Sequence, residues 1–250
     1  GYSDMAIGLS KMFGVDLPIN FNSPYKAHNI TEFWRRWHMT LSQFLRDYLY
    51  IPLGGTRLGP ARRYINLMIT MLLGGLWHGA SWTFVGWGGL HGLYLAINHG
   101  WHELKYRLGI LQTEPKTLEK AFGMALTFLA VVVAWVVFRA PTADSALIVL
   151  KGMTGVNGIV LPSQIASLIP ALAEHVKTAG NLSVLGGGTV MGVVEQFLLT
   201  LFAAVICFVF PNTQEMPFRW KLLTIVLCAG FVIQGVFFGR KPSEFLYFQF

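Results

Sequence analysis

Residues 29–98 decide the fold of this chain. They begin with NITEFWRRWHMTLSQFLRDYLYIPLGG (residues 29–55), which is aromatic, basic and amphipathic. After a basic turn they continue with YINLMITMLLGGLWHGASWTFVGWGGLHGLYLAIN (residues 64–98), which is almost wholly apolar. Two histidines, His78 and His91, nevertheless lie within the apolar part. An ionisable side chain inside a run suited to lipid is costly, so it is a functional candidate by default.

The composition of the whole chain indicates an integral membrane protein. Of its 250 residues, 54% are hydrophobic and only 12% are charged, against roughly 25% charged residues in soluble domains. The mean hydropathy is +0.51. The net charge of +7 fits basic loops that contact anionic lipid better than a solvated face that binds nucleic acid. We therefore predict membrane lipid, and no nucleic acid, as a partner.

The apolar segments predict an all-α, polytopic membrane fold, because only helices satisfy their own backbone groups within a short apolar run. We expect helices at membrane depth, and no β-sheet, over residues 64–76, 81–98, 122–138, 190–210 and 222–238. The first two segments form either two spans or a broken hairpin. Residues 99–120 are expected to be a loop, and residues 145–188 a connection with two moderately apolar helices.

The chain is expected to form a single integral-membrane domain over residues 1–250, since no linker or repeat divides it. Its abrupt start without an initiator Met predicts a C-terminal fragment whose N-terminal spans are missing. Basic residues flank residues 64–98 on both sides, which predicts that both flanking loops are cytoplasmic. Arg240 and Lys241 would then lie outside, against that rule.

A single amphipathic helix is expected over residues 29–50. Asn29 with Glu32 three residues later resembles a capping box, with Asn in place of Ser or Thr. Aromatic and Leu side chains recur at four-residue spacing along one face, with charged residues opposite. Such a helix is expected to lie at a shallow angle in the membrane interface. We expect His38 to turn toward His78, because a polar side chain that faces hydrocarbon is costly.

Two motifs carry the strongest signal, FWRRWHMTLSQFLRDYLYIPLGG (residues 33–55) and GLWHGASWTFVGWGGLHG (residues 75–92). Together they resemble the membrane-bound O-acyltransferase (MBOAT) family, and within it the branch of the alginate O-acetyltransferase membrane subunit and its cell-wall relatives. Three further stretches are similar to that branch: AWVVFRAPTADSAL (134–147), FPNTQE (210–215) and SEFLYFQF (243–250). The resemblance implies an MBOAT-like helical ring with interfacial or re-entrant helices, multi-pass in the bacterial inner (cytoplasmic) membrane.

The resemblance also implies an activity. It implies transfer of an acetyl or other acyl group across the membrane for O-acetylation of a cell-surface or exported polysaccharide such as alginate or peptidoglycan. In the family the histidine of the WHG motif is catalytic, which is His78 here, and the second site residue of the RWH-type motif is His38 here. The donor substrate would be an acyl thioester such as acetyl-CoA, with no tightly bound cofactor and no metal. A periplasmic acetyltransferase- or esterase-like protein would be the partner.

Elementary chemistry favours histidine for this task. A hydroxyl is a poor nucleophile near neutral pH, and a positioned base such as His78 contributes about 10²–10⁴-fold to its reaction. A donor is also needed where negative charge develops on the carbonyl oxygen, and His38 is the candidate. We expect His78 to face a polar tunnel that is open toward both sides of the membrane.

Other interpretations stay open at this point. The chain could be a polytopic transporter or channel in which His38 and His78 relay protons. That function needs repeat symmetry or paired broken helices, and the sequence shows at most one broken helix. We expect His91 to have a packing role. His99 and His102 have the spacing of a metal-binding pair, but no carboxylate or cysteine completes the set, so a solvated loop is favoured.

Overall fold

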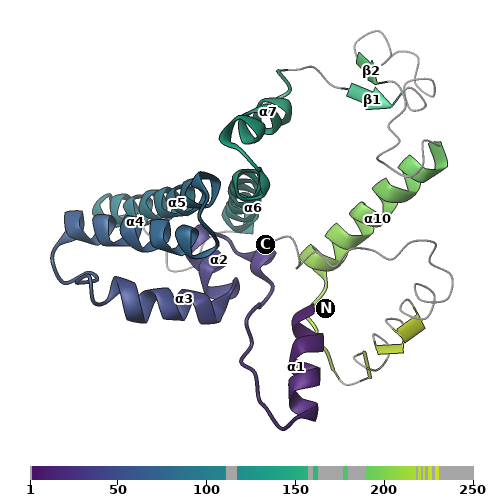
Figure 1. Cartoon of the computed structure of the whole chain (residues 1–250), viewed down its shortest axis with the longest axis horizontal. Coiled ribbons are helices and arrows are strands. Elements are labelled where there is room, and N and C mark those ends of the chain that lie inside the picture. The colour runs from purple at the N-terminus through teal and green to yellow at the C-terminus, as the bar shows by residue number, and fades with distance from the viewer. Residues whose placement is uncertain are drawn as a thin grey trace.

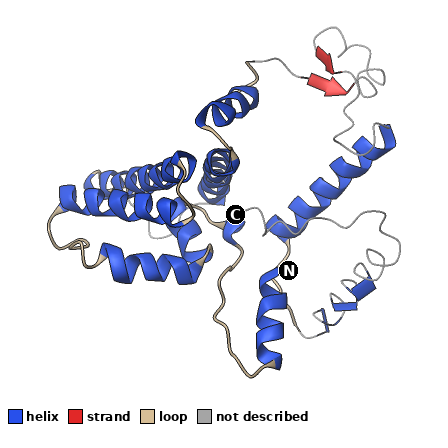
Figure 2. Cartoon of the chain, viewed as in Figure 1, coloured by secondary structure: helices blue, strands red, loops and turns tan. Residues whose placement is uncertain are grey.

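The computed structural model describes residues 2–110, 117–156, 160–162, 177–179 and 190–217, together with a few positions from 219 to 230. Within these residues the architecture is helical (Figure 1), as the sequence predicted. Figure 2 shows one short pair of strands beside the helices.

The N-terminal part of the chain is a series of short helical elements joined by loops. In chain order these are α1 (Tyr2–Met12), η1 (Pro24–Lys26), α2 (Ile30–Arg36), α3 (Met39–Leu45) and the π-helical turn η2 (Arg46–Tyr50). The long helices follow them. Among the short elements, α2 packs against α5 and η2 packs against α4. Two of these short elements therefore cover part of the long helices.

The centre of the fold is an antiparallel hairpin of α4 (Pro60–Trp77) and α5 (Trp82–Arg107), which lie side by side in Figure 1. Two glycines allow the helices to touch backbone to backbone. A Cβ at Gly75 would lie 2.2 Å from the carbonyl oxygen of Phe84, and one at Gly88 would lie 2.2 Å from that of Met71. Small residues are what such close helix contacts require. The two apolar segments are thus a hairpin with its turn at residues 78–81.

Both helices extend beyond the segments predicted from the sequence. Helix α4 begins at Pro60, because the fixed φ of proline suits the first helical position. Helix α5 continues past residue 98, so the predicted loop over 99–120 is wrong for residues 99–107. It is also wrong for residues 117–120, which are helical. An ion pair between Arg107 Nε and Glu103 Oε1, 2.8 Å apart at i, i+4 spacing, supports the last turns of α5.

Helix α6 (Thr117–Arg139) packs along α5 and confirms the helix predicted over residues 122–138. In the described part of the chain it is the one helix that is long and apolar enough to cross a membrane. Large apolar side chains on it, such as Phe122 and Leu126, are exposed. Such a surface suits lipid or further helices better than water.

The connection after α6 differs from the expectation. Helix α7 (Ala143–Met153) forms there, capped by the Thr142 hydroxyl, which accepts the Ser145 N–H at 3.2 Å. Two three-residue strands, β1 (Val160–Pro162) and β2 (Lys177–Ala179), then pair in parallel. Two helices and no sheet were expected here, but a proline such as that ending β1 does not suit a helix interior. The rest of this connection lies outside the described residues.

Helix α10 (Val190–Val209) confirms the helix predicted over residues 190–210. It ends just before Pro211, as expected for a residue that cannot continue a helix. The segment predicted over residues 222–238 falls mostly outside the described residues, and its described positions are helical.

A buried aromatic core forms where α2 crosses α5 and α6. Its buried members are Ala27, Ile30, Phe33, Trp34, Met71, Trp87, Leu95, Val131 and Ala134. Large rings bury much apolar area and fix one another's orientation by edge-to-face contact. The core therefore fixes α2 against the α4–α5 hairpin and positions the residues that follow α2.

Gly88→Ala should destabilise the hairpin, because the new Cβ would lie 2.2 Å from the Met71 carbonyl oxygen. Overpacking of this kind costs about 1–3 kcal/mol, which lowers the melting temperature by roughly 2–12 °C in a chain of this size. The measurement is thermal unfolding of the detergent-purified full-length protein. Gly86→Ala is the matched control, since its nearest atom, Val137 Cγ1, is 3.6 Å away. Equal losses in both variants would contradict the close approach.

Candidate functional site

His38 lies at a break between α2 and α3. Its backbone has φ +44° and ψ +55°, the left-handed conformation that costs a non-glycine residue about 1–2 kcal/mol. The continuous helix predicted over residues 29–50 was therefore wrong. Asn29 was confirmed as the N-cap, because its Oδ1 accepts the Glu32 N–H at 2.8 Å. The return bond differs from that of a capping box, since Glu32 Oε2 accepts the His28 N–H, at 2.8 Å, in place of the Asn29 N–H.

The loop at residues 20–22, which precedes α2, forms hydrogen bonds on both sides of this break. The Met39 N–H donates to the Asn20 carbonyl oxygen at 2.9 Å, and the Asn22 N–H donates to the Arg36 carbonyl oxygen at 2.8 Å. Asn20 Oδ1 also accepts the Thr40 N–H at 3.1 Å and the Thr40 hydroxyl at 3.0 Å. The end of one helix and the start of the next both need partners for their backbone groups. The loop supplies these partners, so its hydrogen bonds stabilise the break between the two helices.

Residues 210–215 support this loop from far along the chain. Asn212 Nδ2 donates to Asn22 Oδ1 at 2.7 Å and to Ser23 Oγ at 3.2 Å. The FPNTQE motif therefore stabilises the loop that caps the break at His38. Sequence reasoning noted the motif only as part of a resemblance and did not connect it with the site.

His78 lies at the turn between α4 and α5. Its N–H donates to the Gly75 carbonyl oxygen at 3.0 Å, which closes the last turn of α4. The half-buried imidazole is surrounded by aromatic rings. The centroid of its ring lies 5.2 Å from that of Trp87 and 5.0 Å from that of Phe138, both in edge-to-face geometry. These contacts restrict the orientation of the imidazole.

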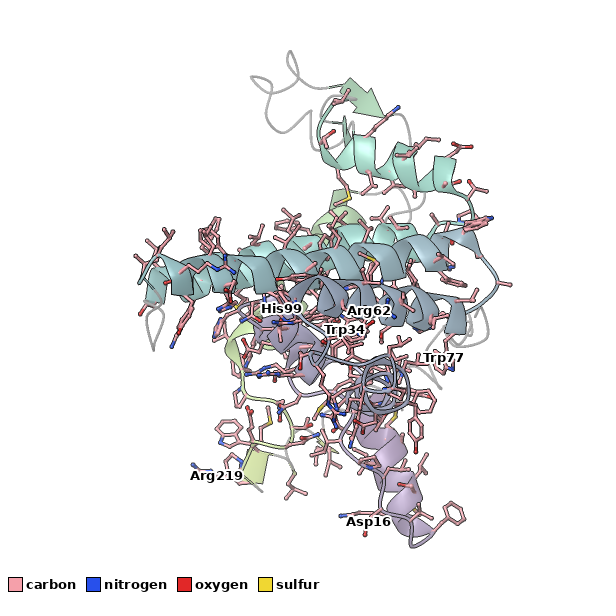
Figure 3. The ribbon with its side chains drawn as sticks, turned by 90° about the vertical axis from the view of Figure 1, so that its left-hand side faces the viewer. Asp16, Trp34, Arg62, Trp77, His99 and Arg219 are labelled. Atoms are coloured by element: carbon pink, nitrogen blue, oxygen red, sulfur yellow. The ribbon has the colours of Figure 1, made fainter. Side chains whose placement is uncertain are left out.

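His38 and His78 line one pocket of about 730 Å³. Its aromatic walls are Phe21, Trp37, Trp77, Trp87, Trp135 and Phe138. The Trp77 ring contacts both histidines, with its centroid 6.3 Å from that of His38 and 5.0 Å from that of His78. In Figure 3, Trp77 lies toward one end of the α4–α5 hairpin, well away from His99. The structure thus brings together the two histidines that the sequence singled out.

The pocket differs from the polar tunnel that we expected. Its lining is mainly aromatic and aliphatic, and a few polar side chains, such as Asn20 and Thr40, interrupt it. A second pocket of about 320 Å³ lies on the other side of Phe138, which lines both pockets. Among the described residues, His78 therefore faces an apolar chamber in which few groups compete for hydrogen bonds.

Burial also affects the charge state of His38. The surroundings of this half-buried side chain lower its pKa below the ordinary value, and an interaction with its own backbone opposes that effect in part. Desolvation disfavours the charged form of an imidazole. Near neutral pH the side chain is therefore mainly neutral, with one nitrogen that donates a hydrogen bond and one that accepts.

Residues 1–109 match the family model of MBOAT, the membrane-bound O-acyltransferase family. This part of the chain is therefore similar to an MBOAT domain. It contains both histidines of the pocket, the hairpin and the helix break. The family is membrane-bound, in agreement with the composition and with the apolar helix α6.

The chain is also similar to individual acyltransferases over longer ranges. It is 40% identical to the peptidoglycan O-acetyltransferase of Helicobacter pylori over 257 residues, which covers 100% of this chain and 46% of that protein. It is 51% identical to the probable alginate O-acetylase AlgI of Pseudomonas aeruginosa over 146 residues, which covers 58% of this chain and 26% of that protein. It is 32% identical to the teichoic acid D-alanyltransferase of Streptococcus thermophilus over 152 residues, which covers 55% of this chain and 37% of that protein. The chain thus spans less than half the length of these relatives.

His91 is buried behind the pocket, with 1% of its surface exposed. Trp34 Nε1 donates a hydrogen bond to His91 Nδ1 at 3.2 Å, and the Phe33 ring stacks on the imidazole with an interplanar angle of 12°. The Trp87 ring separates His91 from the pocket, with centroids 4.8 Å apart. This environment agrees with the expected packing role. Sequence reasoning missed the Trp34–His91 hydrogen bond, although the two residues lie in the two motifs that it paired.

His99 and His102 lie on α5 and do not line the pocket. His99 Nε2 is 3.5 Å from the Thr31 hydroxyl, to which Asn98 Nδ2 also donates at 2.9 Å. In the part of the chain that the structure describes, no three His, Cys, Asp or Glu side chains gather in a way that would hold a metal. These contacts give His99 a role in the packing of α2 on α5.

Replacing His38 by Gly should cost less stability than replacing it by Ala. Glycine adopts φ +44° without steric strain, whereas alanine keeps a strain of about 1–2 kcal/mol. The larger unfolded-state entropy of glycine offsets about 0.4–1 kcal/mol of that difference, so the Gly variant should melt up to roughly 6 °C higher. Both variants lack the imidazole, so the comparison isolates the backbone. The measurement is thermal unfolding of the two purified full-length variants. A Gly variant that melts below the Ala variant would mean that the residue does not hold the left-handed conformation.

Proposed function

We propose that the protein to which this chain belongs transfers an acetyl group from a thioester to a hydroxyl, for O-acetylation of a cell-surface or exported polysaccharide. The observation that carries the proposal is the meeting of His38 and His78 in one aromatic pocket, with both histidines in the part of the chain that matches the MBOAT family model. Relatives named for peptidoglycan O-acetylation, alginate O-acetylation and teichoic acid D-alanylation support acyl transfer. They support it over the alternative of a transporter with a histidine proton relay.

In the proposed reaction the hydroxyl oxygen attacks the carbonyl carbon of the thioester. His78 takes the hydroxyl proton as the C–O bond forms, because neutral imidazole is a suitable base near neutral pH. The tetrahedral intermediate then collapses: the C–S bond breaks, and the thiolate leaves and takes up the proton from His78. The products are one O-acyl ester and one thiol, and no further reactant is needed.

His38 has a separate task in this proposal. Its neutral imidazole donates a hydrogen bond to the carbonyl oxygen, where negative charge develops during the attack. The aromatic walls of the pocket exclude water, which strengthens that hydrogen bond and protects the thioester from hydrolysis. The left-handed backbone at His38 supports a functional assignment, because strained residues gather at active sites.

The substrates are proposed from the same chemistry. The donor is a cytoplasmic thioester such as acetyl-CoA, which reacts and leaves without being a resident cofactor. The acceptor is a hydroxyl on a periplasmic acetyltransferase- or esterase-like partner, which then modifies a polymer such as alginate or peptidoglycan. Transfer between compartments requires the pocket to be reached from both sides of the membrane.

We further infer a multi-pass protein of the bacterial inner membrane, with the helices of this chain forming part of an MBOAT-like ring. Exposed apolar side chains on α6 and α10, among them Leu129, Phe197 and Phe202, support lipid or further spans around them. The short, broken helices α2 and α3 suit the interface or the protein interior, because their charged side cannot face hydrocarbon.

His78→Ala in the full-length protein should lower acyl transfer at least about 100-fold while leaving membrane insertion intact, because the base is lost. His38→Ala should reduce transfer but leave residual activity, since carbonyl stabilisation is separable from the base. The measurement is acetate released from the surface polymer by mild base, normalised to the amount of protein in the membrane. His102→Ala, outside the pocket, is the control and should retain activity. Near-normal acetylation by a well-expressed His78→Ala variant would remove the base from the mechanism.

A further inference from the structure

A pair of phenylalanine rings lies directly behind His78. The centroids of the Phe84 and Phe138 rings are 4.8 Å apart. The His78 ring contacts both, with centroid distances of 6.2 Å to Phe84 and 5.0 Å to Phe138. Phe138 lines the pocket of the two histidines, and both phenylalanines line the second pocket. The ring pair therefore separates the two pockets at the proposed catalytic base.

The backbone of the hairpin turn fixes the first of these rings. Gly79 has φ +154°, and a Cβ there would lie only 2.8 Å from Phe84 Cε2. The ring of Phe84 thus packs on a surface that only glycine leaves open. The second ring is fixed by the core: Phe138 lies 5.3 Å from Trp87, centroid to centroid, besides its contact with His78. Rings held on several sides have little freedom to move apart.

The spacing of the rings leaves no room for an acyl chain between them. A carbon chain keeps about 3.5–4.0 Å from the carbon atoms on each side of it, so two rings with a chain between them must stand roughly 7–8 Å apart. The observed 4.8 Å is well below that value. With its carbonyl at His78 and its methyl group toward Phe138, a two-carbon acyl group needs no space beyond the rings. A longer chain that continues in that direction would have to pass them to reach the second pocket.

We propose that the Phe84–Phe138 pair limits the length of the acyl group accepted at His78, so that acetyl is selected over longer acyl chains. This inference rests on the proposed acyl transfer and assigns its specificity to two residues. Beyond the rings, the second pocket of about 320 Å³ offers the space that a longer chain would use. Removal of one of the two rings would join the two pockets and allow longer acyl groups to react at His78.

The test compares acetyl-CoA with butyryl-CoA as donors for the full-length protein and for its Phe138→Ala variant. One methylene in a tight apolar pocket changes kcat/KM by about 10–200-fold. Phe138→Ala should therefore raise the butyryl-to-acetyl ratio of kcat/KM at least about tenfold. Phe128→Ala is the matched control, because Phe128 lies on the same helix, packs on Tyr25 and Phe208, and lines neither pocket. Its ratio should equal that of the wild type.

A milder variant keeps the test decisive. If Phe138→Ala folds poorly or transfers neither group, Phe138→Leu must still raise the ratio, since it removes the ring and keeps much of the volume. An unchanged ratio in a folded variant that still transfers acetyl overturns the role of the ring pair and leaves the proposed function standing. A wild-type protein that transfers neither acyl group would refute the proposed function itself.

Discussion

The close approach of α4 and α5 is the constraint on which the rest of the structure depends. Gly75 and Gly88 bring the two backbones into contact, and this contact makes the turn at residues 78–81 tight. His78 therefore projects from the end of a rigid hairpin, and Gly79 leaves space there for an aromatic ring. The hairpin also presents His91 and Trp87 to α2, whose Trp34 donates to His91. That contact fixes the direction in which the chain leaves α2.

The position of His38 follows from two further restraints. The aromatic core orients α2, and the loop at residues 20–22 ends that helix and starts α3 by supplying hydrogen bonds to both. Asn212 connects this loop to the chain after α10. Three segments far apart in sequence thus act on one strained residue. The core orients α2, the loop makes hydrogen bonds that a continuous helix would have made internally, and Asn212 supports the loop. The left-handed conformation of His38 is retained because several contacts on both sides of the residue fix its backbone.

Much of the site could be predicted from sequence because its signals are local. The WHG motif singled out His78, Asn29 and Glu32 predicted the start of α2, and apolar length predicted α6 and α10. The break at His38 could not be predicted, since residues 20–22 and Asn212 act on it from a distance. The continuation of α5 past residue 98 was missed because its polar composition suggested a loop. The aromatic pocket and the Phe84–Phe138 pair arise only when three helices pack together.

The central claim is that acyl transfer takes place in the pocket that His38 and His78 share. A structure of the full-length protein with a non-reactive thioether analogue of acetyl-CoA tests it most directly. We expect the acetyl carbonyl to lie in the aromatic pocket, with its oxygen within hydrogen-bond distance of His38, its carbon beside His78, and its methyl group against Phe138. An analogue bound with its acetyl group outside this pocket, or with both histidines remote from the carbonyl, would contradict the account.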